Sequence, residues 1–193
     1  EEIDRKNSQL IFSKDKNHIS FDYDNLVIAT GTEPRLMPTD NSDMEGVHYL
    51  RSISDVEKIK SSLKDSKNMV IIGGGYIGLE VAAVSKTLGL NVTVIEMASR
   101  ILERVTSPTI SSFYNSFHES KGVKILTSTS VKGINGDKRV SSVETSSGTI
   151  DADIVIVGIG VLPCQSLAED SGIAVDNGII VDEFCKTSDD NIF

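Results

Sequence analysis

Apolar residues in this chain gather in short runs separated by glycine, proline and polar residues, a pattern typical of alternating strands and helices. Residues 69–72, 92–96 and 154–157 are mainly apolar and β-branched, which predicts strands buried on both faces, as in a parallel sheet. Residues 25–29 form another continuous run that stops at Thr30, so we expect a buried strand there as well.

Helix signals lie between these strands. Ser54 and Glu57 have the spacing of a capping box at the start of an amphipathic helix. Residues 76–88 have a helical pattern, and Gly89 stands where a left-handed cap belongs. Residues 107–122 open with Ser-Pro and close at glycine, which predicts another helix.

Other short runs predict antiparallel structure. Residues 8–12 and 18–21 flank a polar turn and predict a β-hairpin. Residues 124–126, 130–134 and 140–144 predict three short strands before the last parallel strand. The expected fold class is therefore α/β, with a Rossmann-like doubly wound parallel sheet and an antiparallel β excursion.

Charge and composition exclude several functions. The formal net charge is −9 and no block of Lys and Arg could follow a phosphate backbone, so nucleic-acid binding is not expected. No apolar run approaches the roughly 20 residues of a membrane span. The three histidines have no metal-ligand spacing, and no metal site is expected.

The two cysteines, Cys164 and Cys185, form no CxxC motif. Two separate buried thiols are a better interpretation than a redox pair, since structural disulfides are rare in cytosolic chains. We expect a cytoplasmic protein. The first residues contain no basic segment followed by an apolar one, so they do not form a signal peptide.

The chemistry is concentrated in the segment Gly73-Gly74-Gly75-Tyr76-Ile77-Gly78. A lone GxGxxG is weak evidence, but here it follows a predicted buried strand and opens a predicted helix. The next strand ends in Glu96, roughly 20 residues later, as the dinucleotide fingerprint requires. The segment therefore predicts a Rossmann half-site for a nicotinamide dinucleotide.

Each residue of this motif has a physical role. Gly73 permits a tight turn, Gly75 lets the diphosphate approach the backbone, and Gly78 lets the helix pack close to the sheet. The helix N-terminus directs free N–H groups at the phosphates. Glu96 would accept hydrogen bonds from the adenosine ribose and repel a 2′-phosphate, which favours NADH over NADPH.

Several neighbouring residues leave two interpretations open. Glu80 is either a carboxylate that stabilises the helix N-terminus or a contact to the nicotinamide carboxamide. Tyr76 is either a packing residue or an aromatic cover for the nicotinamide. The segment Gly158-Ile159-Gly160 follows a buried strand and is either a plain turn or a second approach point facing the same crevice. Arg100 and Arg104 could weaken the preference for NADH.

These segments resemble the FAD-dependent pyridine nucleotide-disulfide oxidoreductase superfamily over essentially the whole chain. Residues 23–31 resemble its "ATG" segment, and residues 73–80 resemble its NADH fingerprint. Residues 154–163 are similar to its strand-GxG-x-x-P element, and residues 187–193 to the lead-in of its last flavin motif. Residues 100–114 are similar to the ferredoxin/rubredoxin reductase type.

The resemblance implies cofactors, a partner and site residues. FAD would be contacted by Thr30, Gly31 and Arg35. NADH would be surrounded by Gly73, Gly74, Gly75, Tyr76, Ile77, Gly78, Glu80, Glu96, Arg104, Gly158, Ile159 and Gly160. NADH would reduce the flavin, which would pass electrons to a small iron–sulfur protein of the ferredoxin or rubredoxin type. The resemblance assigns no catalytic side chain and no metal ligand.

The sequence departs from this family in two places, because it has no N-terminal FAD fingerprint and ends before the last flavin motif. We therefore expect a fragment that alone binds FAD weakly or not at all and is inactive. Residues 46–163 would form the NADH domain, and residues 1–45 and 164–193 would be pieces of an FAD domain. The alternatives are an NADH oxidase or peroxidase, a nitrite-reductase flavoprotein segment, or a non-catalytic NADH-binding interaction module.

Overall fold

The computed structural model describes residues 1–14 and 17–193, and the chain divides into two compact units. Unit 1 contains Glu1–Glu33 and Val161–Phe193, and unit 2 is the continuous segment Pro34–Gly160. Unit 2 begins before the expected domain start at residue 46, because Met37 and Met44 pack against its core. The chain passes between the units at β4 (Thr32–Pro34) and β13 (Val161–Pro163).

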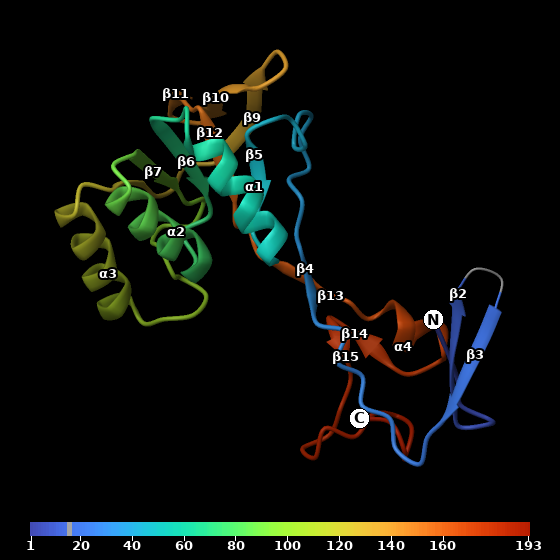
Figure 1. Ribbon diagram of the computed structural model, residues 1–193. Coiled ribbons are helices and arrows are strands. Elements are labelled where there is room, and N and C mark those ends of the chain that lie inside the picture. The colour runs from blue at the N-terminus through green and yellow to red at the C-terminus, as the bar shows by residue number, and fades with distance from the viewer. Residues whose placement is uncertain (15–16) are drawn as a thin grey trace. The chain divides into compact units, whose positions relative to one another are not determined.

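Unit 2 is built on a five-stranded parallel sheet, which confirms the expected fold class (Figure 1). Its strands, in spatial order, are β5 (Val47–Tyr49), β12 (Ile154–Val157), β6 (Asn68–Ile72), β7 (Asn91–Ile95) and β8 (Lys124–Leu126). The central strand β6 pairs with β12 through Ile72 and Val157, and with β7 through Ile72 and Ile95. The carboxyl ends of these three strands therefore meet at one edge.

The two faces of this sheet are covered differently. Met69 and Ile71 of β6 point into a cluster with Ala82 of α2 (Tyr76–Thr87), and α1 (Ile53–Leu63) packs on the same cluster. Val70 and Ile72 point into a cluster on the opposite face, which also contains side chains of the antiparallel sheet. That sheet contains β9 (Val131–Gly136), β10 (Val140–Thr145) and β11 (Gly148–Asp151). Successive side chains of a strand point to opposite faces, so the uninterrupted apolar run of β6 contributes apolar side chains to both faces of the sheet.

The helix ends are set by local hydrogen bonds. The capping box of α1 is formed by Ser52 and Asp55, so the predicted box at Ser54 and Glu57 was wrong. Asp55 accepts from the backbone N–H of Ser52 at 2.8 Å, and this box starts the helix two residues earlier. The predicted cap of α3 (Pro108–Ser120) at Ser107 is confirmed. Gly89 has a φ of 91° after α2, as a left-handed cap requires.

Unit 1 combines an antiparallel sheet with short C-terminal elements. The sheet contains β1 (Glu2–Asp4), β2 (Gln9–Lys14) and β3 (Asn17–Asp22), so the predicted hairpin is confirmed. Residues 15–16 of its predicted turn lie outside the described residues. The later elements are α4 (Ser166–Asp170), β14 (Val175–Asp176) and β15 (Gly178–Ile179).

Residues 25–29 do not form the buried strand that their apolar run predicts. Only Leu26 makes a β-bridge, to Ile192, and the Val27 side chain is 70% exposed. The segment bonds to residues 191–193 on one side only. An apolar run becomes a buried strand only when neighbours cover both its edges and its faces, and the described residues supply one edge.

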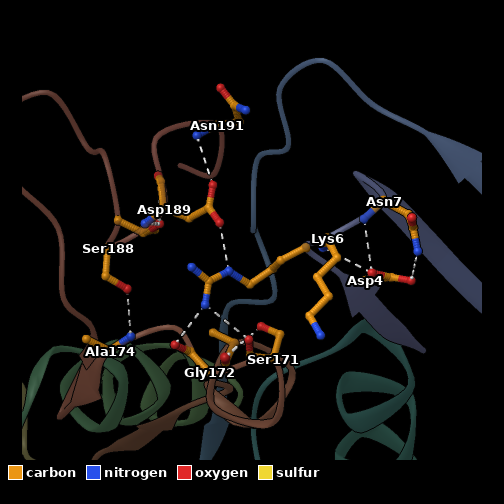
Figure 2. A network of polar contacts seen from close by, with 12 residues as sticks. Asp4, Lys6, Asn7, Ser171, Gly172, Ala174, Ser188, Asp189 and Asn191 are labelled. Carbon is orange, nitrogen blue, oxygen red and sulfur yellow. Dashed lines mark hydrogen bonds and ion pairs between the residues drawn. The ribbon is translucent and has the colours of Figure 1, made fainter.

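A polar network joins three distant segments of unit 1 (Figure 2). The Arg5 guanidinium donates to the Asp189 carboxylate at 2.7 Å and to the carbonyl oxygen of Gly172 at 3.1 Å. Asp189 in turn accepts from the backbone N–H of Asn191 at 3.1 Å. This bond from Arg5 is the main reason that the pKa of Asp189 lies below its usual value.

Candidate functional site

The glycine turn lies where β6 ends and α2 begins. Gly73 has a φ of 110°, and its N–H donates to the Ile95 carbonyl of β7 at 2.8 Å. A Cβ on Gly73 would overlap the carbonyl of Gly158, which follows β12. Two glycines at the ends of neighbouring strands are thus in direct backbone contact, and position 73 leaves no space for a side chain.

Gly75 and Gly78 surround the first turn of α2. A Cβ on Gly78 would overlap the Gly73 carbonyl, so this glycine lets the helix approach the turn. A Cβ on Gly75 would meet no atom within 4 Å, and no side chain caps the helix at this residue. The first N–H groups of a helix lack intrahelical acceptors. The structure therefore has open space and backbone donors where a diphosphate would bind, and the residues fit that group.

The Glu96 carboxylate lies just after β7 and accepts two backbone hydrogen bonds. Its Oε2 accepts from the N–H of Gly74 at 2.7 Å, and its Oε1 accepts from the N–H of Ala98 at 2.7 Å. Each carboxylate oxygen can accept more than one bond, so the carboxylate can still accept from ribose hydroxyls. The second residue of the turn is therefore held directly by the acidic residue of the fingerprint.

The loop after β7 contains both arginines considered above. The Arg100 guanidinium donates to the carbonyl of Thr106 at 3.1 Å and to that of Glu103 at 2.9 Å. Arg100 therefore closes its own loop, and Arg104 is the one whose side chain is exposed.

The segment 158–160 lies at the same sheet edge as the glycine turn. The Gly158 N–H donates to the Ile72 carbonyl at 2.8 Å. Ile159 packs against the core, and Gly160 has a φ of 112°. The Gly160 carbonyl accepts from the backbone N–H of Arg35 at 2.9 Å. The structure thus places Gly158 beside Gly73, as the expected shared crevice requires.

The side chains expected near the nicotinamide are accessible. Tyr76 is 52% exposed at the first residue of α2, and Ile77 and Glu80 are also exposed. Tyr76 therefore is not a core residue of unit 2, and this exposure argues against its interpretation as a packing residue. For Glu80 both interpretations stay open.

The residues assigned to FAD do not all lie in one unit. Thr30 and Gly31 belong to unit 1, whereas Arg35 belongs to unit 2. Within unit 1, the Thr30 hydroxyl donates to the Cys164 carbonyl at 2.5 Å, and the Cys164 N–H donates to the Gly31 carbonyl at 2.9 Å. Gly31 has a φ of 72°, a conformation that favours glycine.

Both cysteines are free thiols, as the interpretation of two separate thiols expects. Cys185 is exposed, however, so the expectation that both are buried was wrong. It lies in a tight turn in which the Cys185 N–H donates to the Asp182 carbonyl, and apolar residues do not enclose it. Within residues 1–14 and 17–193, no helix is long and apolar enough to cross a membrane.

The site contains contacts that the sequence motif does not reveal. The N–H of Leu102 donates to the Gly74 carbonyl at 2.9 Å, so the loop after β7 touches the glycine turn. Leu102 and Ala98 contribute backbone groups only, and backbone groups have no signature in a sequence. Only the glycine at position 74, with no Cβ between Ile101 and Glu96, signals the close packing.

A Rossmann-type dinucleotide-binding unit, placed in sequence between two segments of a second unit, is the class that this fold and site define. The family model for pyridine nucleotide-disulphide oxidoreductase matches residues 1–193, and the chain belongs to this family.

Individual relatives point to one branch of the family. The chain is 45% identical over 175 residues to rhodocoxin reductase of Rhodococcus erythropolis, covering 90% of this chain and 41% of that protein. It is 42% identical over 194 residues to putidaredoxin reductase of Pseudomonas putida, covering 97% and 45%. Among solved structures, a ferredoxin reductase from Rhodopseudomonas palustris superposes with a TM-score of 0.93 at 36% identity, covering 99% of this chain and 47% of that one. The chain spans somewhat less than half the length of these relatives.

Proposed function

We propose that this chain is the NADH-binding part of an FAD-dependent oxidoreductase that passes a hydride from NADH to flavin, and then electrons to a small iron–sulfur protein of the ferredoxin or rubredoxin type. The observation that carries the proposal is the open, uncapped N-terminus of α2 at Gly75, behind a turn closed by Gly73 and Gly158. The hydride chemistry is supplied by the two cofactors, and the protein positions them.

The residues of unit 2 divide the work of holding NADH. Gly75 and the N-terminus of α2 would bind the diphosphate, and Glu96 would accept from the adenosine ribose. Tyr76, Glu80 and the segment 158–160 would border the nicotinamide end. Thr30, Gly31 and Arg35 would contact FAD. No side chain of this chain is assigned a bond-making role.

The relatives favour a reductase with a protein acceptor over an oxidase. The relatives at 38–45% identity include proteins named rhodocoxin, putidaredoxin and rubredoxin reductases. The structure titled as a water-forming NADH oxidase is 22% identical to this chain, a similarity that shows the fold alone. One solved neighbour is a covalent putidaredoxin reductase–putidaredoxin complex, 41% identical to this chain. We also keep a cytoplasmic location as part of this proposal.

Cofactor choice tests the proposal. We expect calorimetric titration of the chain to show NADH binding appreciably tighter than NADPH, because Glu96 repels a 2′-phosphate. Glu96→Ala should shrink that difference, whereas Glu144→Ala, which removes an exposed carboxylate on β10, should leave it unchanged. Equal affinity for both cofactors in the unaltered chain would contradict the role of Glu96. Failure to bind either cofactor would contradict the proposed function.

A further inference from the structure

The peptide groups on either side of Gly74 are held by two residues of the loop after β7, Glu96 and Leu102. The Gly74 N–H donates to Glu96 Oε2 at 2.7 Å, and the Gly74 carbonyl accepts from the Leu102 N–H at 2.9 Å. Gly74 is buried, unlike Gly75, which faces open space. The Gly74 N–H is therefore already bonded to a carboxylate, and the donors left for a diphosphate begin at Gly75.

The segment that holds the Gly74 carbonyl is itself held by burial and by hydrogen bonds within its loop. Leu102 is 2% exposed and has a φ of 55°, a strained conformation for a residue other than glycine. The buried Ser111 hydroxyl donates to the Ile101 carbonyl at 2.6 Å, and Arg100 bonds two carbonyls of the same loop. Strain of this kind persists only where the surroundings enforce it. The loop therefore presents the Leu102 N–H to the Gly74 carbonyl as a donor that its own contacts hold in position.

We infer that Glu96 is a positioning residue for the diphosphate, acting through the backbone of Gly74, in addition to any bond it makes to the ribose. Glu96 and Leu102 hold Gly74 from its N–H and carbonyl sides, and this fixes the adjacent Gly75 and the first N–H groups of α2. The inference rests on the proposed function, and it assigns Gly74 to the turn rather than to the ligand contacts.

A ligand without ribose hydroxyls separates the two roles of Glu96. The probe is an NADH analogue whose adenosine carries 2′,3′-dideoxyribose, which cannot donate to a carboxylate there. Glu96→Gln keeps the shape but provides one acceptor oxygen for two N–H groups, and its NH₂ would face the other N–H. We expect Glu96→Gln to weaken the analogue roughly tenfold and NADH by at least that factor, since NADH can also lose its ribose bond. An analogue affinity that does not change would overturn the inference.

A second variant tests the same turn without changing Glu96. In Gly74→Ala the new Cβ would lie 2.8 Å from Ile101 Cγ2 and 3.2 Å from Glu96 Oε2, so the Ile101 side chain and the carboxylate must both shift. We expect a similar loss for both ligands, even though the carboxylate remains available to ribose. Gly133→Ala is the matched control, because its Cβ would meet no atom within 4 Å and it lies on β9. Should Glu96→Gln not fold by circular dichroism, Gly74→Ala decides the question.

Nuclear magnetic resonance supplies a readout that does not depend on ligand binding. Amide protons bonded to a carboxylate resonate at low field, and we expect this for Gly74 and Ala98. In Glu96→Gln at least one of the two should move upfield, while the resonances of β9 stay in place. Unchanged resonances of both amides would overturn the inference. If the unaltered chain binds neither ligand but shows these shifts, the proposed function fails and the hold on Gly74 is still confirmed.

Discussion

At the scale of single residues, both the backbone conformation at position 73 and the atoms around it require glycine. Gly73→Ala would place a Cβ onto the Gly158 carbonyl, in a backbone with a φ of 110°. We expect the free energy of unfolding to fall by at least about 3 kcal/mol, since the ends of β6 and β12 must separate. Urea unfolding measures this loss.

Gly89 is the matched control for that prediction. It has a φ of 91°, but a Cβ there would meet no atom within 4 Å. Gly89→Ala should therefore cost only the conformational strain, about 1–2 kcal/mol. Equal losses for the two variants would show that the strand contact contributes nothing.

At the scale of elements, the start of α1 is decided by hydrogen-bond geometry. Asp55 accepts from the N–H of Ser52 at 2.8 Å and of Arg51 at 3.1 Å, and its pKa is lowered chiefly by its bonds with Ser52. We expect Asp55→Asn to lower the free energy of unfolding by up to about 1 kcal/mol. Glu57→Gln, which changes the position that the sequence pattern favoured, should change it by no more than a few tenths. Thermal unfolding measures both losses. If the capping box were at Ser54, Glu57→Gln would show the larger loss.

At the scale of the whole molecule, the two units should respond separately to mutation. Arg5→Gln removes the bond that joins the start of unit 1 to Asp189 and Gly172. Both side chains are partly exposed, so we expect unit 1 to lose no more than about 1 kcal/mol at pH 7. Hydrogen exchange should quicken in residues 1–14 and 161–193 and stay unchanged in residues 34–160. Faster exchange throughout would contradict the division into units.

The sign of the pH dependence follows from Asp189. Its folded pKa lies below the ordinary 3.8, so the carboxylate stabilises the fold above pH 3.8 and this contribution is lost as the pH falls through the lowered value. The stability difference between the unaltered chain and Arg5→Gln should therefore shrink between pH 5 and the acid range. Urea unfolding at about pH 7 and about pH 3 measures both differences, and a constant difference would exclude Asp189 as the partner.

The sequence was sufficient wherever a local pattern and its burial agreed. The runs at residues 69–72 and 154–157 are apolar at every position. Such runs predict strands that are buried on both faces of a sheet, and the structure has strands there. The glycines 73, 75 and 78 each match one steric requirement, which is why the turn could be placed before the structure. Residues 25–29 have an equally apolar pattern but remain largely exposed, because burial depends on neighbours that a local pattern does not contain.

The sequence by itself determined the strand–turn–helix around Gly73 and the acidic residue at the end of the next strand, since these follow from local sterics and spacing. Only the tertiary structure decided that Glu96 and Leu102 hold Gly74 from both sides, that Gly158 closes on Gly73, and that Ser52 caps α1. Each of these is a contact made by a backbone group or chosen among neighbouring polar residues. Such contacts depend on distances in the folded chain, and no local sequence pattern reveals them.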